Sequence, residues 1–487
     1  MKQRFKITLL ASFASMILFA SCEKTLDTMA TLNLNENSPT SVIPSALLTQ
    51  AESSGVFTDQ GGFGDGPLGI FNGHMAGNHA TGLNYNQYQL TNNDFQGLFL
   101  NAYLSSMMNL KQIIVNAKAT ETAYVGIAQI LQAYELGYVT SLYGNIPWSE
   151  ALDVVKFPHP KYDTQVEIYT AMQGLLASGI KNIATGGTVK GDILYNGDLA
   201  KWKALAYMLS ARYYNHMSKK DATGSATSTL AAIAAAKSAG FTSSDNDLQL
   251  SYDGSATFLN PWNATWENGM YVANTPFLDL ILTTKDPRVR AYYTSTSWTS
   301  GTPSYGLGKS QDGDVGTGNY MTPGDSTFFG ATNAPQLFAT YFELKFIEAE
   351  ANMRAGNAAA AAAALNAAVA AQLKKVMNFD EDAALVPAYI ATYASETATT
   401  VTMEKIMTEK YKAMICQEAE TWMDVRRHNY AYPTGMQAIP VISNVTPTKV
   451  KVASAFIQRL LYPQSELNNN AANVPKVVMF DKLPILQ

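Results

Sequence analysis

Residues 121–152 read ETAYVGIAQILQAYELGYVTSLYGNIPWSEAL. From Glu121 to Tyr143 apolar residues lie on nearly every side of a 3.6-residue period, which is typical of a helix buried all round. Gly144 stands where such a helix would stop and Pro147 follows it, as both residue types commonly do after a helix end. The stretch predicts a long buried helix and indicates a mainly α fold.

Other stretches predict further helices that pack in pairs. Apolar residues recur at intervals of three and four in residues 95–118. We also expect helices over 164–184, 198–219, 342–376 and one long last helix over 402–427. The stretch 342–376 should break at Ala355-Gly356-Asn357, because Gly356 can take the left-handed conformation and Asn357 is a good N-cap. Paired helices with small residues at their contacts predict stacked hairpins of the tetratricopeptide kind, in four pairs of which the last is incomplete.

Two stretches lack this periodicity. Residues 53–94 are rich in Gly, Asn and aromatics, and residues 240–335 are rich in Gly, Thr, Ser and aromatics with short strand-like runs. We therefore expect one domain over 46–487, with helical repeats at about 95–239 and 336–427. The stretch 240–335 would be an irregular insertion on the helical scaffold rather than a separate domain.

The N-terminus predicts export and a lipid anchor. Three basic residues precede the apolar stretch 7–21, which at 15 residues is shorter than the roughly 20 needed to span a bilayer. Leu18, Ala20, Ser21 and Cys22 resemble the lipobox of bacterial lipoproteins, so residues 1–21 would be a signal peptide. Cys22 would be lipidated, and residues 22–45 would form a tether and an N-terminal segment. An ordinary signal peptide followed by a chance cysteine is the alternative.

The composition limits the classes of partner. Removing residues 1–21 takes away three of the 34 basic residues and none of the 39 acidic ones, which leaves a net charge of −8. That charge disfavours nucleic acid as a partner. The chain contains 26 Tyr, 20 Phe and 6 Trp and only 15% charged residues, so its surface suits neutral, hydroxyl-rich ligands. With Cys22 acylated, Cys416 would have no disulfide partner, and we expect it to be a buried small side chain.

Several segments resemble those of one family in the same order along the chain. Leu142, Tyr143, Gly144, Pro147 and Trp148 are similar to a Leu-Tyr-Gly turn signature of the SusD/RagB outer-membrane lipoproteins of Bacteroidetes. Further similar segments are NENSPTSVIPSALL (35–48), DPRVRAYY (286–293), EAEANMRAGN (348–357), EKYKAMICQEAETWMDVRR (409–427) and RLLYPQSELNNN (459–470). The resemblance implies a SusD-like, tetratricopeptide-like fold. It also implies a cell-surface lipoprotein that binds a nutrient, usually a glycan, and delivers it to a SusC-like TonB-dependent β-barrel transporter.

The family resemblance further implies that ligand is held outside the repeats. Aromatic residues in Gly-rich surroundings of the insertion could offer flat faces to sugar rings, with amides and hydroxyls nearby. The candidates for glycan binding are Trp262, Trp266, Trp298, Tyr305 and Tyr320 in the insertion, with Asn84 and Tyr85 in the stretch GLNYNQYQL. For each aromatic, the alternative is a place in a small core under a long loop.

A metal site has weak support. Asp312 and Asp314, with Asn319 nearby, lie in the Gly-rich run QDGDVGTGN and could hold Ca²⁺. The run lacks the spacing and the final bidentate Glu of an EF-hand, so a solvated turn is favoured. We expect no cofactor.

We expect no enzyme activity, because no nucleophile elbow is present. Glu348 and Glu350 lie on a predicted repeat helix, where bonding to neighbouring backbone or facing solvent is the simpler interpretation. Three alternatives remain: a peptide-binding relative, a tethered glycoside hydrolase, which would need two carboxylates flanking a bond, and a repeat protein that acts only in assembly.

Overall fold

The computed structural model describes residues 42–55, 57, 60, 64–294, 297–299, 302–304, 306–309, 317–377, 385–434 and 456–487. Residues 1–41, with Cys22 and the expected signal peptide, lie outside these ranges, as do Tyr305, Asp312 and Asp314. Residues Pro44–Gln487 cluster as one compact unit. None of the helices in the described part combines the length and apolar content needed to span a bilayer.

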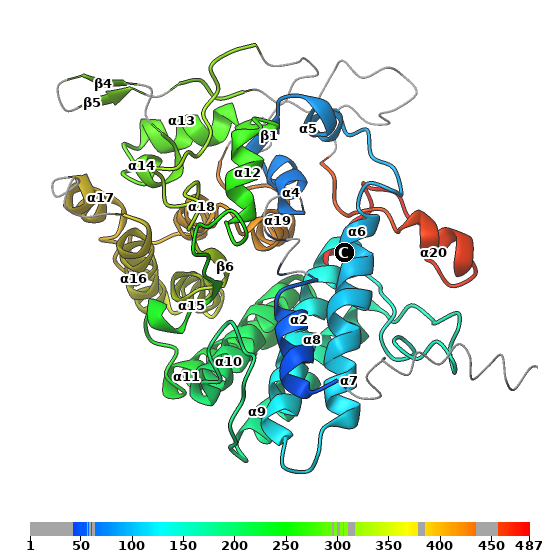
Figure 1. Cartoon of the computed structure of the whole chain (residues 1–487). Coiled ribbons are helices and arrows are strands. Elements are labelled where there is room, and N and C mark those ends of the chain that lie inside the picture. Colours follow the sequence, from blue (N-terminus) through cyan, green and yellow to red (C-terminus); the bar gives the residue numbers. More distant parts are fainter. Residues whose placement is uncertain are drawn as a thin grey trace, which may run out of the picture. The chain divides into compact units, whose positions relative to one another are not determined.

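Helices dominate the chain (Figure 1). The first part contains α2 (Pro44–Glu52), α4 (Asp65–Asn72), β1 (Met75–Gly77), α5 (Ala80–Asn86), α6 (Gln96–Leu100), a π-helical segment (Asn101–Met107), α7 (Met108–Asn116) and α8 (Thr122–Tyr143). The next helices are α9 (Gln165–Ile183), α10 (Leu199–His216) and α11 (Ala222–Ser238).

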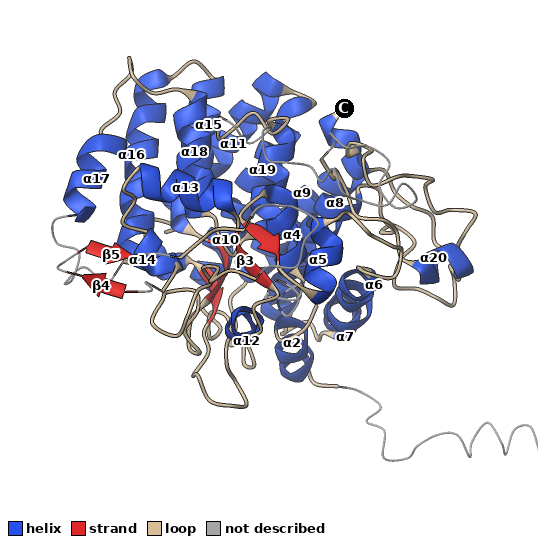
Figure 2. Ribbon diagram, turned by 90° about the horizontal axis from the view of Figure 1, so that it is seen from above, coloured by secondary structure: helices blue, strands red, loops and turns tan. Residues whose placement is uncertain are grey.

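The insertion then contains β2 (Leu248–Leu250), α12 (Pro261–Glu267), β3 (Tyr271–Ala273), α13 (Thr275–Thr283), α14 (Val289–Tyr292), β4 (Ser297–Thr299), β5 (Thr302–Ser304) and β6 (Gln336–Ala339). The last part contains α15 (Tyr341–Arg354), α16 (Ala358–Val376), α17 (Leu385–Tyr393), α18 (Met403–Ala413), α19 (Glu418–Arg427) and α20 (Gln464–Asn469). In the described part of the chain the strands form three antiparallel two-stranded sheets, β1–β3, β2–β6 and β4–β5, and the last of these stands at one edge in Figure 2. The expected mainly α, tetratricopeptide-like class is confirmed.

The first two helix pairs are shifted by one helix along the chain relative to the expected pairs. The most extensively packed pairs are α8 with α9, α10 with α11, and α15 with α16. We expected 95–118 to pair with 121–143 and 164–184 with 198–219. The helix α11 was not predicted, because its apolar residues are mainly alanines spread around the helix without an apolar face. Between α8 and α9, Gly126 and Gly179 let the two backbones approach closely, since a Cβ on either would crowd the carbonyl of the other.

The expected single helix over 402–427 is also wrong, because α18 and α19 are separate. Cys416 lies between them with φ of +61°, a left-handed conformation that interrupts a helix. The Glu418 carboxylate accepts a hydrogen bond from the Cys416 backbone N–H at 2.9 Å, which stabilises this turn. The Cys416 side chain is buried, as expected. Asn357 does stand before α16 after Gly356 (φ +79°), although its side chain makes no capping bond.

The Leu-Tyr-Gly turn after α8 is fixed by the C-terminal segment. Arg459 donates to the carbonyl of Tyr143, and the Tyr462 hydroxyl donates to the carbonyl of Asn145 at 2.8 Å. The Tyr143 and Tyr462 rings stack with centroids 6.1 Å apart. Gly144 has φ +83° and ψ −116°, a conformation that is essentially restricted to glycine. Two of the segments that carried the family resemblance therefore contact each other across the fold.

A buried ion cluster joins the insertion to the last helices. Asp286 accepts from Nε of Arg288 at 2.8 Å, and Arg288 also bonds Glu409 of α18 at 2.8 Å. Lys412 of α18 lies 3.4 Å from Asp286 and also bonds Glu409 and the Tyr389 hydroxyl. Asp286, Arg288 and Lys412 are at most 1% exposed. Two acids and two bases thus neutralise each other, as buried charges must.

Candidate functional site

The insertion displays an aromatic pair, formed by Tyr252 and Phe258, which we call the ring pair. The two centroids lie 5.0 Å apart at a tilt of 44°, and Phe258 is 41% exposed while Tyr252 is half-buried. The Tyr252 hydroxyl donates to Gln336 at 2.7 Å, and the Gln336 amide donates to the carbonyl of Phe57 at 2.9 Å. Tyr252 is therefore held by the underlying sheet strand, and Phe258 presents apolar ring surface to solvent.

The loop that carries the ring pair is a tight turn. Gly254 has φ +76° and lies against Thr332 and Asn333. The Ser255 backbone N–H donates to Asp253 at 2.8 Å, and the Phe258 N–H donates to the Ser255 carbonyl at 3.0 Å. These bonds turn the chain back on itself and bring Phe258 beside Tyr252.

Polar groups surround the ring pair. Asp253, Thr257 and Asn333 are exposed, and Thr332 is half-buried. Hydrogen bonds from Ser255 lower the pKa of Asp253, so this carboxyl is ionised at neutral pH. Neither Tyr252 nor Phe258 was a sequence candidate. The available signal was the run YDGSATF, in which Asp-Gly-Ser marks a turn between two aromatics.

Trp262 and Trp266 do not stand in a loop as expected. Asn260 caps α12 by accepting from the Trp262 N–H at 2.7 Å, and Pro261 occupies the first turn, so this segment is a helix. The two tryptophans lie four residues apart on one face. Their rings stack at 5.0 Å and are 2% and 3% exposed. They form a core of the insertion, and their contact with a glycan stays a prediction that would require α12 to move.

The other insertion candidates are placed only in part. Tyr320 is half-buried and pairs through its backbone with Leu307, which is 63% exposed. Trp298 belongs to β4, opposite Pro303 of β5, but its side chain lies outside what the structure describes. Tyr305 lies outside the described residues, as do Asp312 and Asp314. Their roles stay predictions.

The structure brings the segment around Asn84 next to the insertion. Strand β1 pairs with β3, so that Met75 lies opposite Ala273. His79 bonds the carbonyl of Asn268 at the end of α12 at 2.9 Å. Asn84 itself is exposed. Tyr85 is 7% exposed and stacks on Phe95 at 5.4 Å, and burial raises its pKa to about 12. Tyr85 therefore packs α5 against Phe95, and its ring offers no exposed face to a ligand.

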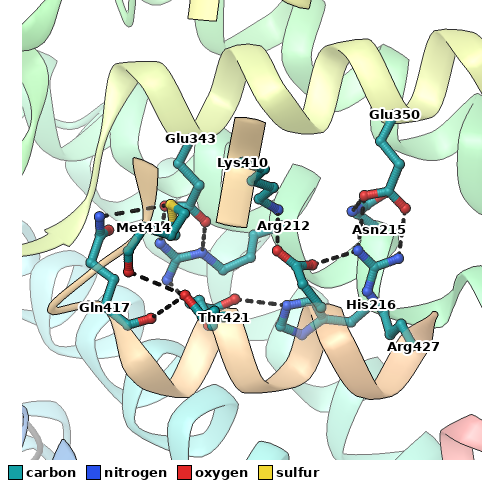
Figure 3. Close-up of polar contacts among 12 residues, drawn as sticks. Arg212, Asn215, His216, Glu343, Glu350, Lys410, Met414, Gln417, Thr421 and Arg427 are labelled. Carbon is teal, nitrogen blue, oxygen red and sulfur yellow. Dashed lines mark hydrogen bonds and ion pairs between the residues drawn. The ribbon is translucent and has the colours of Figure 1, made fainter. Parts of the chain in front are cut away.

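The acidic residues of the repeats form a buried ion network (Figure 3). Glu350 of α15 is fully buried and accepts from Arg427 of α19 at 2.6 and 2.8 Å and from Asn215 of α10 at 2.9 Å. Outside this buried network, the partly exposed Glu348 bonds Lys345 at 2.6 Å and also Lys237. The expectation that Glu348 and Glu350 face solvent or bond backbone is therefore wrong. A helix pattern does not show which cations neighbouring helices supply.

A neighbouring ion cluster joins α10 to α19. Glu420 of α19 lies 2.9 Å from His216 and 3.6 Å from Arg212. Burial raises the pKa of Glu420, but the charges of Arg212 and His216 outweigh burial and lower this pKa to about 2. Glu420 therefore stays ionised, and its role is to tie α10 to α19.

The described residues form a tetratricopeptide-like helical scaffold that carries an irregular insertion. A family model described as "Starch-binding associating with outer membrane" matches residues 36–463, and the chain belongs to this SusD-like family. No curated protein matches the chain significantly in sequence.

Solved structures share the fold. A chitin-binding protein is 22% identical with a TM-score of 0.72, over 88% of this chain and 95% of that one. A SusD homologue from Bacteroides fragilis is 21% identical with a TM-score of 0.72, over 91% and 99%. A chitin-binding SusD homologue from Flavobacterium johnsoniae is 19% identical with a TM-score of 0.68, over 88% and 93%. At these identities the likeness establishes the fold.

Proposed function

We propose that this protein is a lipid-anchored, cell-surface lipoprotein of the outer membrane that binds an oligosaccharide and delivers it to a TonB-dependent β-barrel transporter. The observation that carries the proposal is the exposed Phe258 ring, braced by Tyr252 and flanked by polar side chains, on a chain of the SusD-like family. The family description and the chitin-binding neighbours support a glycan as ligand.

The ring pair has the chemistry that a neutral sugar requires. The C–H face of a sugar ring is apolar and packs on an aromatic face, while its hydroxyls need hydrogen-bond partners at the edge. Asp253, Thr257 and Asn333 provide such partners beside Phe258. Because the rigid aromatic side chain is already held in place, little conformational entropy is lost when the ligand binds.

The proposed role is binding without bond cleavage. A glycosidase would place two carboxyl groups on either side of the scissile bond, roughly 5 to 9.5 Å apart. The buried carboxylates Glu343, Glu350 and Glu420 each bond an arginine or histidine inside the helical scaffold, so they are not available as that pair. Delivery to a transporter also requires release of an intact ligand.

The binding experiment uses the mature chain and two probes, maltohexaose and chitohexaose, in isothermal titration calorimetry. We expect binding of at least one probe and a loss of tenfold or more in affinity in Phe258→Ala, which corresponds to about 1.4 kcal/mol. Phe157→Ala, which removes a half-buried aromatic from a different loop, serves as the matched control and should bind as before. Binding of neither probe, or equal binding by Phe258→Ala, would contradict glycan capture at the ring pair.

The delivery experiment isolates the full chain from outer membranes by affinity purification in mild detergent. We expect a β-barrel protein with the plug domain of TonB-dependent transporters to co-purify in comparable amount. Recovery of the chain without such a barrel would overturn the transporter part of the proposal and leave glycan binding to be judged by the calorimetry.

A further inference from the structure

A groove runs between α9 and α11 on the helical repeats, away from the insertion elements α12–α14, which lie at the opposite end of Figure 1. Helix α10 packs against both α9 and α11 and forms the floor of the groove. The cavity volume is about 250 Å³. This is just below the range of sites for drug-sized ligands, so the groove has room for a ligand of about one ring.

Each wall of the groove is one stripe of a helix. The α9 wall consists of Val166, Tyr169, Thr170 and Gln173, and the α11 wall of Asp221, Gly224, Ser225 and Ser228. Both sets have the spacing i, i+3, i+4, i+7, which places four positions on one helix face, and in the second set Asp221 is the N-cap that precedes α11. The α11 wall carries only short side chains. These short side chains keep the groove open where a second stripe of large residues would have closed it.

The small residue Gly224 has a structural reason to be small. Asp221 is the N-cap of α11 and accepts from the Gly224 backbone N–H at 2.8 Å. A Cβ on Gly224 would collide with the Asp221 carboxylate. The polar start of α11, with the hydroxyls of Ser225 and Ser228, is thus built around a fixed carboxylate at the rim of the groove.

The floor of the groove is aromatic and apolar. Tyr213 is buried, whereas Tyr214 and Met217 are half-buried, and all three belong to α10 or the turn that follows it. On the α9 wall, Tyr169 bonds His216 at 2.9 Å, which fixes its ring. Gln173 exchanges two hydrogen bonds with Ser210, at 2.6 and 3.2 Å, so its amide is oriented before any ligand arrives.

The charges of the groove favour a neutral ligand. Asp221 is the one charged residue among the described residues that line it, and no Lys or Arg is among them. The cation that contacts the α11 wall, Arg354, donates to Ser225 at 2.7 Å and pairs with Glu350 at 3.7 Å, so a phosphate or carboxylate ligand would meet Asp221 and no lysine or arginine of the lining. A purely apolar ligand would leave the hydroxyl and amide groups of the walls without partners.

We propose that this groove is a second saccharide subsite that takes one neutral sugar ring, with its C–H face on the half-buried Tyr214 ring and its hydroxyls on Gln173, Ser228 and Asp221. The proposal does not rest on the ring pair, since the two places lie on different elements of the fold. A subsite of this size would hold a terminal or branching residue of a glycan whose main contact is elsewhere.

The test uses saturation-transfer NMR on the mature chain with glucose and N-acetylglucosamine as probes at millimolar concentration. Ser228→Leu fills the groove at a helical position that Leu tolerates well. Thr227→Leu is the matched control, because Thr227 is the neighbouring exposed residue and is not a lining residue. In the Phe258→Ala background, which removes the proposed main site, we expect saturation transfer to at least one probe, its loss when Ser228→Leu is added, and its persistence when Thr227→Leu is added.

Phe258→Ala separates this proposal from the proposed main site. Saturation transfer that survives Phe258→Ala and disappears in the double variant Phe258→Ala/Ser228→Leu supports a second subsite. Saturation transfer that is lost in Phe258→Ala alone, or that survives in the double variant, assigns the signal to another place and overturns the proposal. The absence of transfer to both probes in the unmodified chain overturns it as well.

Discussion

Arg212 on α10 donates two parallel hydrogen bonds to Glu343 on α15, from Nε to one carboxylate oxygen at 2.7 Å and from Nη2 to the other at 2.6 Å. Both side chains are at most 2% exposed. The same guanidinium lies 3.6 Å from Glu420 on α19 and donates to the carbonyl of Phe338 at 2.8 Å. One arginine therefore connects three elements of the repeat scaffold.

Replacing Arg212 by Met should destabilise the protein strongly. The variant keeps most of the side-chain volume but leaves Glu343 without its cation and Glu420 with His216 alone, and breaking a buried ion pair typically costs about 3–5 kcal/mol. The free energy of unfolding in urea measures this loss. As a control, Lys405→Met breaks a pair with Glu396 in which Lys405 is 46% exposed, and it should cost at most about 1 kcal/mol. Similar losses of unfolding free energy in both variants would contradict the claim that the buried pair contributes more to stability than the exposed pair.

The two tryptophans of α12 should prove to be structural. Trp262→Ala removes a fully buried ring that stacks on Trp266, and such truncations cost about 3–5 kcal/mol. Phe258→Ala, on an exposed ring, should change the free energy of unfolding by less than about 1 kcal/mol. Urea denaturation of the two variants side by side decides the matter. A small effect for Trp262→Ala would restore that residue as a ligand-binding candidate.

Asp65 should make the stability depend on pH. Burial raises the pKa of this carboxyl from 3.8 to about 8, although the Tyr138 hydroxyl donates to it at 2.7 Å. The native state thus holds a proton that the unfolded chain releases above pH 3.8, so this group reduces stability as pH rises from about 4 to 8. Asp65→Asn should flatten that decline in a series of melting curves. An unchanged slope would show that Asp65 is ionised in the native protein.

Gly144 should not tolerate a side chain. Its φ of +83° and ψ of −116° are strained for any other residue, and a Cβ would lie 3.2 Å from Pro484. Gly144→Ala should therefore cost about 1–3 kcal/mol. Gly97→Ala is the control, since Gly97 is helical with nothing within 4 Å of its Cβ position, and it should be neutral or stabilising. Equal melting temperatures for the two variants would refute the conformational argument.

Cys22→Ala should release the protein from membranes, because the lipid anchor would have no attachment point. Fractionation of cells followed by immunoblotting measures the change. Cys416→Ala provides the matched control, since Cys416 is buried in the fold and should leave membrane retention unchanged. Retention of Cys22→Ala in the membrane fraction would show that lipidation at Cys22 is not the anchor.

The helices with strong apolar periodicity could be predicted from the sequence. The buried helix α8, its end at Gly144 and the break at Gly356 were all predicted, because local stereochemistry determines them. The helix α11 could not be predicted, since its Ala, Ser and Thr residues carry little apolar contrast. The break at Cys416 depends on the Glu418 carboxylate, a tertiary arrangement that periodicity does not report.

The candidate site was predictable only as a region. The sequence pointed to aromatics in the insertion, and the ring pair does lie there. The sequence does not show that Trp262 is buried and Phe258 exposed, because the exposure of each ring depends on the segments that pack over it in the fold. Asn260 and Pro261 turn the tryptophan segment into a helix whose apolar face packs inward. Phe258, two residues earlier, is left on the turn outside that helix.

The ion cluster has a consequence for unfolding. It consists of Asp286, Arg288, Glu409 and Lys412. If the insertion unfolded alone, Asp286 and Arg288 would become exposed to water. Glu409 and Lys412 of α18 would then lose these two partners. Separating the insertion from the repeats would therefore leave buried charges unpaired on both sides, so we expect the two parts to unfold as one cooperative unit. The exposed loops of the insertion can then vary in sequence, while we expect the base that carries them to unfold together with the rest of the fold.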